Sequence, residues 1–202
     1  MLVHLLVPAE IPKLENALAR GADALWLAGR SSAVADCLRA ARQLRPGRQK
    51  LYVHIESRGE TIEQDLDELI AAAPDGIVLP VSHGAEVEHL GVRLAVREAE
   101  LGLEDGTTQI IGLIAAPAAI FQLRTLAATS RRLVALSFDA RAFANALDVS
   151  DGDSGPLNLA RHLTVLAAKA AGIPALLIDD ETESLATTAK RDGFDGIVRR
   201  AP

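Results

Sequence analysis

Two polar residues at the close of one apolar run could carry acid–base chemistry. His54 and Glu56 lie two positions apart at the end of the run 51–55. Side chains two positions apart on a strand project from the same face. If that face lines the interior of a barrel near its opening, the imidazole and the carboxylate form a candidate catalytic or ligand-binding pair. The competing interpretation is a His–Glu hydrogen bond with only a structural role.

Polar residues also follow three other apolar runs. Arg30, Ser82, and the pair Asp139 and Arg141 each come after such a run. A guanidinium offers parallel N–H donors to carboxylate or phosphate groups, so the two arginines are candidates for anion binding. Asp139 and Arg141 could instead pair with each other, and Ser82 could be a solvated loop residue. The candidate residues for binding a substrate or anion are Arg30, His54, Ser82, Asp139 and Arg141.

A metal site built from imidazole and carboxylate groups is a further possibility. Such a mixed set suits Zn²⁺ or Mn²⁺ better than Mg²⁺. His54, Glu56, His83 and Asp139 could supply it if the fold brings them together. Sequence spacing alone does not show that they converge, so we predict no metal and no other cofactor.

The composition excludes several classes of partner. Acidic residues number 27 and basic residues 21, which gives a formal charge of -6, and the two signs are interspersed. Nucleic-acid binding requires a clustered basic face, and a membrane span requires roughly 20 apolar residues in a row. The single cysteine, Cys37, allows no internal disulfide and suits a reducing compartment. We therefore expect a cytoplasmic protein with neither a nucleic-acid nor a membrane partner.

Strand-like and helix-like segments alternate along the whole chain. Continuous apolar runs of this length are typical of parallel strands that helices cover on the outside. Eight such units favour a closed barrel over an open doubly wound sheet. The pattern predicts one α/β domain over residues 1–202, a (β/α)8 TIM-type barrel with eight parallel strands at 2–7, 24–27, 51–55, 76–80, 109–114, 133–138, 174–178 and 196–198.

Seven helices are expected between these strands, at 11–20, 31–44, 61–73, 86–101, 117–128, 157–171 and 181–191. The chain ends at Pro202, directly after the eighth strand, so the eighth helix is expected to be missing. We predict that another subunit covers the barrel wall there, because an exposed apolar sheet face is costly.

A short turn with a central aspartate precedes three of the expected strands, at Asp23, Asp75 and Asp195. These turns lead from a helix into a strand, and in a barrel they lie at the end opposite the active site. The pattern therefore indicates a structural role for the three carboxylates.

Several segments, taken in order, resemble the HpcH/HpaI aldolase and citrate lyase β-subunit family. They cover nearly the whole chain and lie at residues 5–8, 21–25, 74–80, 111–114, 132–138, 159–175 and 193–196. The resemblance implies an oligomeric barrel that forms or cleaves carbon–carbon bonds in acyl-CoA thioesters or small oxo acids. It also implies Mg²⁺ held by a glutamate and an aspartate at the carboxyl ends of strands, with a third-strand arginine on the substrate.

This chain departs from the family pattern at those positions. The resemblance places the fifth-strand glutamate at Ala115 and the sixth-strand aspartate at Ala142. Mg²⁺ needs oxygen ligands to offset its dehydration, and alanine supplies none. The other family positions are also altered: the acidic pair that ends the second strand falls at Ala28 and Arg30, and the third-strand arginine and its companion asparagine fall at His54 and Glu56.

Two functions therefore remain open. The first is a divergent relative, a pseudoenzyme, that has lost the metal-dependent lyase reaction and acts as a binding or interaction subunit, with a small carboxylate or acyl-CoA as its ligand. The second is an active lyase or aldolase-type enzyme on a small oxo acid or acyl-CoA thioester, with His54 as base in a changed residue set. A homo-oligomer is expected in either case.

Overall fold

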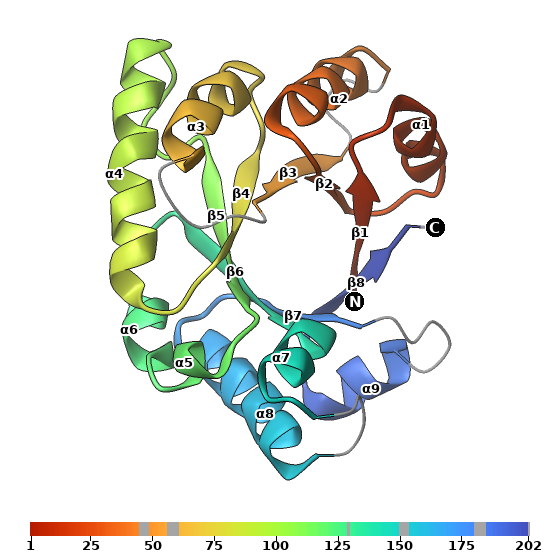
Figure 1. Cartoon of the computed structure of the whole chain (residues 1–202), viewed down its shortest axis with the longest axis vertical. Coiled ribbons are helices and arrows are strands. Elements are labelled where there is room, and N and C mark those ends of the chain that lie inside the picture. The colour runs from red at the N-terminus through yellow and green to blue at the C-terminus, as the bar shows by residue number, and fades with distance from the viewer. Residues whose placement is uncertain (45–48, 56–60, 129, 150–153, 180–184, 202) are drawn as a thin grey trace.

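Eight parallel strands close into a barrel in sequence order, as the alternation of segments predicts (Figure 1). The computed structural model describes residues 1–44, 49–55, 61–128, 130–149, 154–179 and 185–201. The strands are β1 (Leu2–Pro8), β2 (Ala24–Ala28), β3 (Lys50–His54), β4 (Gly76–Pro80), β5 (Gln109–Ile114), β6 (Leu133–Asp139), β7 (Ala175–Ile178) and β8 (Gly196–Arg200).

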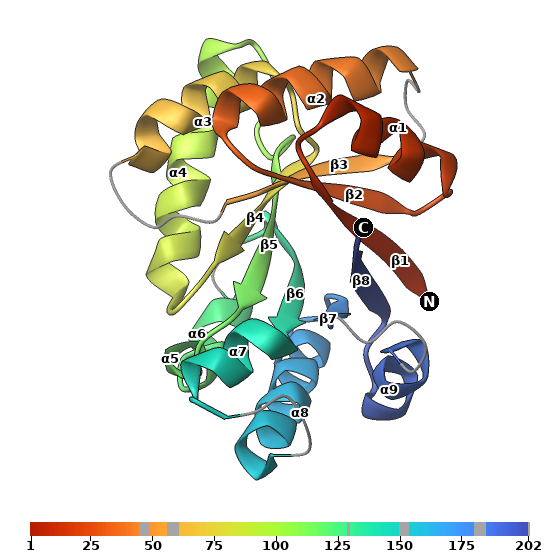
Figure 2. The same ribbon diagram turned by 45° about the vertical axis from the view of Figure 1, so that its right-hand side comes forward.

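Helices surround the barrel, with α1, α2 and α3 over one side and α7, α8 and α9 over the opposite side (Figure 2). Among the described residues, none of these helices is long and apolar enough to cross a membrane. The helices are α1 (Ile11–Ala19), α2 (Ser31–Leu44), α3 (Thr61–Ala71), α4 (Gly84–Glu100), α5 (Pro117–Ile120), α6 (Leu123–Ala128), α7 (Ala140–Ala146), α8 (Gly155–Ala170) and α9 (Leu185–Asp192).

Two connections differ from the sequence-based expectation. The single helix expected over 117–128 is divided into α5 and α6, and the carbonyl of Gln122 accepts hydrogen bonds from the amides of Thr125 and Leu126 where the second helix begins. The short helix α7 was not expected. It follows β6 without a loop, and its alanine-rich sequence carries no helical periodicity to predict it.

Side chains alternate between two apolar layers along every strand. One layer packs between the strands and the helices, and it includes Leu25, Leu136 and Ile197. The other fills the inside of the barrel, where Trp26 is fully buried beside Tyr52. This alternation determines which polar side chains reach the inside of the barrel.

The three aspartates at the helix-to-strand turns have the structural role that the sequence predicts. The carboxylates of Asp23, Asp75 and Asp195 accept hydrogen bonds from the backbone N–H groups of Val3, Leu51 and Ala175, at 2.8, 2.8 and 2.9 Å. Each bond joins the turn before an even-numbered strand to the start of the strand that precedes it in the barrel. The carboxylates thus fix the register at the amino-terminal end of β1, β3 and β7.

The expectation that the barrel wall beside β1 and β8 is uncovered is wrong. Leu5 on β1 is 5% exposed, and Val7 and Ile197, which also belong to the outer layer, are fully buried. No helix follows β8 in the described part of the chain, which ends at residue 201. Helix α1 contacts β1 and α9 contacts β8, so these helices cover the wall without a second subunit.

Candidate functional site

The carboxyl ends of the strands meet at one end of the barrel, which we call the barrel mouth. Enzymes of this fold carry their chemistry at this end. The alternation of side chains turns Ala28 on β2 and Ala115 after β5 toward the inner apolar layer. The same alternation places His54, Asp139 and Arg200 on the inner face, two positions beyond Tyr52, Ser137 and Val198 respectively.

His54 lies at the end of β3 and on the inner face, which is the condition that the sequence analysis set for a catalytic or binding role. It is half-buried, and in the strand register it stands beside Ala28 on β2 and Val78 on β4. Glu56 lies outside the described residues, so the pairing of His54 with Glu56 stays a prediction. The imidazole alone remains as a candidate proton-transfer group at the barrel mouth.

An ion pair joins β6 and β8 at the barrel mouth. Nη2 of Arg200 donates to Oδ2 of Asp139 at 3.1 Å, across the intervening strand β7. The other carboxylate oxygen of Asp139, Oδ1, accepts the backbone N–H of Ala142 at 2.9 Å and caps α7. Both oxygens of this buried carboxylate therefore have protein donors.

Sequence reasoning missed Arg200 and gave Asp139 the wrong partner. Asp139 does not pair with Arg141, because α7 begins at once after β6 and carries Arg141 to an exposed position. The predicted eighth strand ended at Val198, so Arg200 was left outside it. The signal was present in the chain, since a residue two positions beyond an inward-facing valine is inward-facing if the strand continues.

The other predicted anion-binding residues lie around the rim of the barrel mouth. Arg30 is exposed after β2, and Ser82 is half-buried after β4. His83 precedes α4 and is exposed, with Nε2 3.9 Å from a carboxylate oxygen of Glu86. The structure thus gathers these side chains at one end of the barrel but does not bring them into a single cluster.

The described side chains do not fit a Mg²⁺ ion at the barrel mouth. At the two family ligand positions the chain has Ala115 and Ala142, whose methyl groups cannot ligate a hard cation. Asp139 has both oxygens engaged, and Asp179 after β7 accepts from Nη2 of Arg161 at 3.3 Å. Among the described residues no three His, Cys, Asp or Glu side chains gather as a metal-binding group. The mixed set of His54, Glu56, His83 and Asp139 therefore has no support from the described part of the chain.

A buried hydroxyl lies one inward position below Asp139 on β6. Ser137 is fully buried, and its Oγ has no hydrogen-bond partner among the residues that the structure describes. A buried hydroxyl without a partner carries a desolvation cost, which a bound molecule or water would relieve. The floor of the barrel mouth therefore offers a polar contact beneath the ion pair.

The opposite end of the barrel contains a small cavity. It measures about 220 Å³, and its lining includes His4, Lys50 and Tyr52. Nε1 of Trp26 donates to Nδ1 of His4 at 3.0 Å, so His4 is a satisfied interior residue. Burial lowers the pKa of His4 to about 4, against the opposing effect of Asp23.

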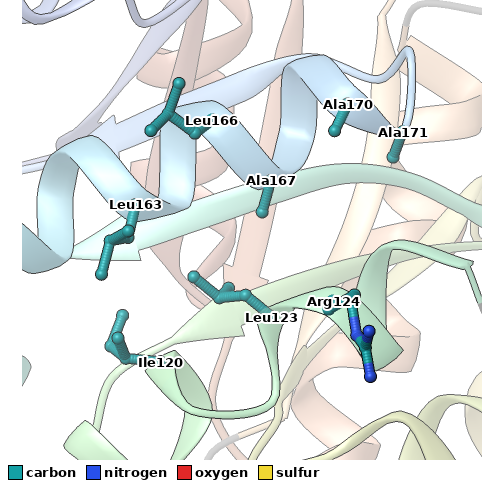
Figure 3. Close-up of a pocket in the computed structure, with 8 residues that line it drawn as sticks. All are labelled: Ile120, Leu123, Arg124, Leu163, Leu166, Ala167, Ala170 and Ala171. Carbon is teal, nitrogen blue, oxygen red and sulfur yellow. The ribbon is translucent and has the colours of Figure 1, made fainter.

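A larger apolar groove lies on the outside of the barrel, between α8 and the pair α5 and α6 (Figure 3). Its volume is about 450 Å³, and Leu123 faces Leu163 and Ala167 across it. Arg124 is the only charged residue of its lining among the described side chains. The groove lies on the outside of the barrel, and none of its described lining residues is suited to catalysis.

Comparison with known proteins identifies the family and the fold. A family model described as HpcH/HpaI aldolase/citrate lyase matches residues 9–202. No curated protein matches the sequence. Among solved structures, RipC from Yersinia pestis is 22% identical with a TM-score of 0.71, covering 100% of this chain and 90% of that one.

Two other solved structures are similar at still lower identity. A HpcH/HpaI aldolase/citrate lyase family protein from Burkholderia cenocepacia J2315 is 17% identical with a TM-score of 0.82, covering 99% of this chain and 88% of that one. A citrate lyase from Burkholderia xenovorans LB400 is 18% identical with a TM-score of 0.83, covering 100% and 73%. At these identities the likeness establishes a shared fold.

Proposed function

The chain belongs to the HpcH/HpaI aldolase/citrate lyase family, and we propose that it is a divergent member that has lost the metal-dependent carbon–carbon lyase reaction. On this proposal it acts as a binding or interaction subunit for a small carboxylate or acyl-CoA ligand. We also propose that it functions in the cytoplasm as a homo-oligomer and uses no cofactor.

This proposal is supported by the side chains that stand where metal ligands would be expected at the barrel mouth. A divalent ion at this end of the barrel would polarise a substrate carbonyl. The positions that would hold it are Ala115 and Ala142, and the nearby carboxylate of Asp139 is committed to Arg200 and to the cap of α7. A carboxylate that already has donors on both oxygens gains little from a cation and would lose those bonds by turning toward one.

The charges around the barrel mouth support binding of an anion. Arg30 and Arg141 are exposed at its rim, and Arg200 projects into it from β8. Guanidinium groups bind carboxylates in a planar, two-bond arrangement. A small carboxylate, free or attached to a larger thioester, is the ligand class that suits these cations.

Calorimetry of the full chain with metal tests the loss of the cofactor. After treatment with EDTA and its removal, the protein is titrated with MnCl2 in the presence and absence of oxaloacetate. We expect no heat of binding with micromolar affinity in either titration. Micromolar affinity that Asp139→Asn abolishes would overturn the proposal, because it would place a metal at the barrel mouth.

A variant that restores the family carboxylates provides the positive control. Ala115→Glu combined with Ala142→Asp supplies two oxygen ligands at the positions where the resemblance places them. We expect this double variant to bind Mn²⁺ more tightly than the natural sequence does. Thermal unfolding of both proteins, followed by circular dichroism, establishes that the comparison is between folded chains.

The alternative function is an active lyase or aldolase-type enzyme that uses a changed set of residues. The position of His54 on the inner face of the barrel mouth favours it. Carbon–carbon cleavage of oxo acids and acyl-CoA thioesters is measured in the presence of EDTA. Turnover that His54→Ala abolishes and that His89→Ala, an exposed change on α4, leaves intact would support this function, and an inactive panel would count against it.

A further inference from the structure

We propose that the cavity at the amino-terminal end of the barrel is a second binding site, which takes a small uncharged molecule about the size of one six-membered ring and holds its oxygen by a hydrogen bond from Nε2 of His4. This site is separate from the barrel mouth and independent of the function proposed there. Two features support it: a deeply buried imidazole that uses only one of its nitrogens, and an open volume beside that ring.

The cavity exists because small side chains stand where the barrel interior begins. Side chains normally fill the inside of a barrel of this type. Here Ala24 at the start of β2 and Ala135 on β6 belong to the lining, and about 220 Å³ is left open. A dry cavity of about 150 Å³ holds a molecule of benzene. The volume at this end of the barrel is therefore sufficient for one ring with a polar substituent.

His4 supplies a hydrogen-bond donor to this volume. The residue is 7% exposed and lines the cavity. Within the described chain, its only hydrogen bond is the one that Nδ1 accepts from Nε1 of Trp26, at 3.0 Å. Trp26 is not among the lining residues, so Nδ1 faces away from the cavity. The neutral ring carries its proton on Nε2, which is thus an unused donor on the opposite edge of the ring.

Tyr52 supplies an acceptor to the same volume. Its ring stacks on that of His4, and its Oη donates to Oε1 of Gln109 at 3.3 Å. All three residues line the cavity. Because the hydroxyl of Tyr52 has used its proton, its lone pairs are available to accept a hydrogen bond. A ligand hydroxyl would therefore meet a donor on His4 and an acceptor on Tyr52.

The charges of the lining favour an uncharged ligand. Lys50 and Asp23 are the only charged residues in the described lining, and their charges cancel. Nζ of Lys50 lies 3.5 Å from Oδ1 of Asp75, and Oδ2 of Asp23 accepts the amide of Val3. Burial lowers the pKa of His4 to about 4, so its ring is neutral at pH 7. An anion would enter a largely apolar space without a free cation to balance its charge.

Titration of the full chain with phenol at pH 7 tests the site. The readout is the indole Nε1–H signal of Trp26 in ¹⁵N–¹H spectra, which is unique because the chain has one tryptophan. Its bond to His4 makes this signal sensitive to a ligand on the other edge of the imidazole. Phenol is compared with toluene, which has a methyl group in place of the hydroxyl, and with benzoate, which carries a negative charge.

Three substitutions locate the ligand. Ala135→Leu fills the cavity from β6, and Ala19→Leu is the same change at an exposed position on α1. His4→Asn keeps an oxygen that can accept from Trp26 but has no group in the place of Nε2. Tyr52→Phe, which removes only Oη, serves as a second polar change. Circular dichroism first establishes that each variant is folded.

We expect phenol to bind with a Kd of about 1 mM or lower. Toluene and benzoate should bind at least about fivefold more weakly, because toluene leaves Nε2 without a partner and benzoate buries a charge. Ala135→Leu should weaken phenol binding about tenfold or more, since its side chain occupies the same space. His4→Asn and Tyr52→Phe should narrow the difference between phenol and toluene, and Ala19→Leu should leave both affinities unchanged.

Several results would overturn the proposal. An unshifted Trp26 signal at millimolar phenol would show that the cavity takes no such ligand. Phenol binding that Ala135→Leu leaves unchanged would place the ligand elsewhere on the chain. Equal affinity for phenol and toluene would remove the role of His4, and tighter binding of benzoate than of phenol would contradict the uncharged class. None of these results depends on the metal titrations at the barrel mouth.

Discussion

Trp26 on β2 donates a hydrogen bond from Nε1 to Nδ1 of His4 on β1, at 3.0 Å, inside the barrel. The ring of His4 also stacks on that of Tyr52, with centroids 6.3 Å apart and an interplanar angle of 14°. Because Nδ1 accepts, the neutral imidazole must carry its proton on Nε2. Protonation of Nδ1 would break the bond to Trp26, so the barrel interior favours the neutral form.

The depressed pKa of His4 predicts acid-sensitive stability. Burial lowers this pKa from 6.5 to about 4. Between these values the unfolded chain binds more protons than the folded chain, so stability is complete above pH 6.5 and is lost as the pH falls toward 4. The loss is at most ~3 kcal/mol.

Urea unfolding between pH 4 and pH 7 measures this effect. In His4→Gln the amide oxygen can accept the hydrogen bond from Trp26. This variant should therefore show a free energy of unfolding that depends less on pH. His162→Gln removes a largely exposed imidazole from α8 and should leave this dependence unchanged. An identical slope in His4→Gln and the natural chain would show that another group titrates.

The buried ion pair between Glu98 on α4 and Arg132 before β6 predicts a large stability loss on neutralisation. Glu98 is fully buried and accepts from Nη1 and Nη2 of Arg132 at 2.9 and 2.7 Å. The amides of Gly106 and Thr108 also donate to it. Removing its charge leaves the buried Arg132 guanidinium with only the exposed carboxylate of Asp105 as an opposite charge, so Glu98→Gln should cost roughly 3 kcal/mol.

Denaturant unfolding at pH 7 checks that value. Glu100→Gln is the control, because Glu100 is a half-exposed partner of Arg97 on the same helix and should cost under ~1 kcal/mol. Burial raises the pKa of Glu98, but the hydrogen bonds from Arg132, Thr108 and Gly106 outweigh it and lower this pKa to about 2. Stability from Glu98 is therefore present above its ordinary pKa and is lost as the pH falls toward 2.

A homo-oligomer is the expected state in solution. Apolar side chains are exposed on α8 and beside α5, where Leu159, Leu166 and Phe121 are 59%, 64% and 84% exposed. Exposed apolar surface of this kind favours association. Static light scattering at micromolar concentration should give a mass above the 21.3 kDa of one chain, and a stable monomer would contradict the prediction.

The barrel could be predicted because each strand is a short apolar run and each connection is long enough for a helix. Counting in twos along β3 places His54 on the same face as Tyr52. That this face is the inner one emerges only from the structure, in which Tyr52 belongs to the inner layer. The partner of Asp139 could not be predicted, because it depends on β6 and β8 standing one strand apart in a closed barrel. Arg141 is near Asp139 in sequence, but it lies on α7, where its side chain is exposed. Arg200 is 61 positions away in sequence and adjacent in space.

Two substitutions at position 139 can separate the contribution of the Asp139–Arg200 ion pair to stability from that of the cap of α7. Asp139→Asn keeps an oxygen that can accept the amide of Ala142, since asparagine is also a good cap, but it removes the charge that attracts Arg200. Asp139→Ala removes both interactions. We expect Asp139→Asn to cost about 1–2 kcal/mol and Asp139→Ala about 1 kcal/mol more for the lost cap.

The control for both substitutions is Arg200→Gln, which removes the ion pair from its other side. If the pair alone accounts for the loss in Asp139→Asn, then Asp139→Asn combined with Arg200→Gln should cost little more than the larger single change. Urea unfolding of the four proteins measures this coupling. Strict additivity of the two single changes would show that Arg200 and Asp139 act independently, and that the carboxylate serves α7 alone.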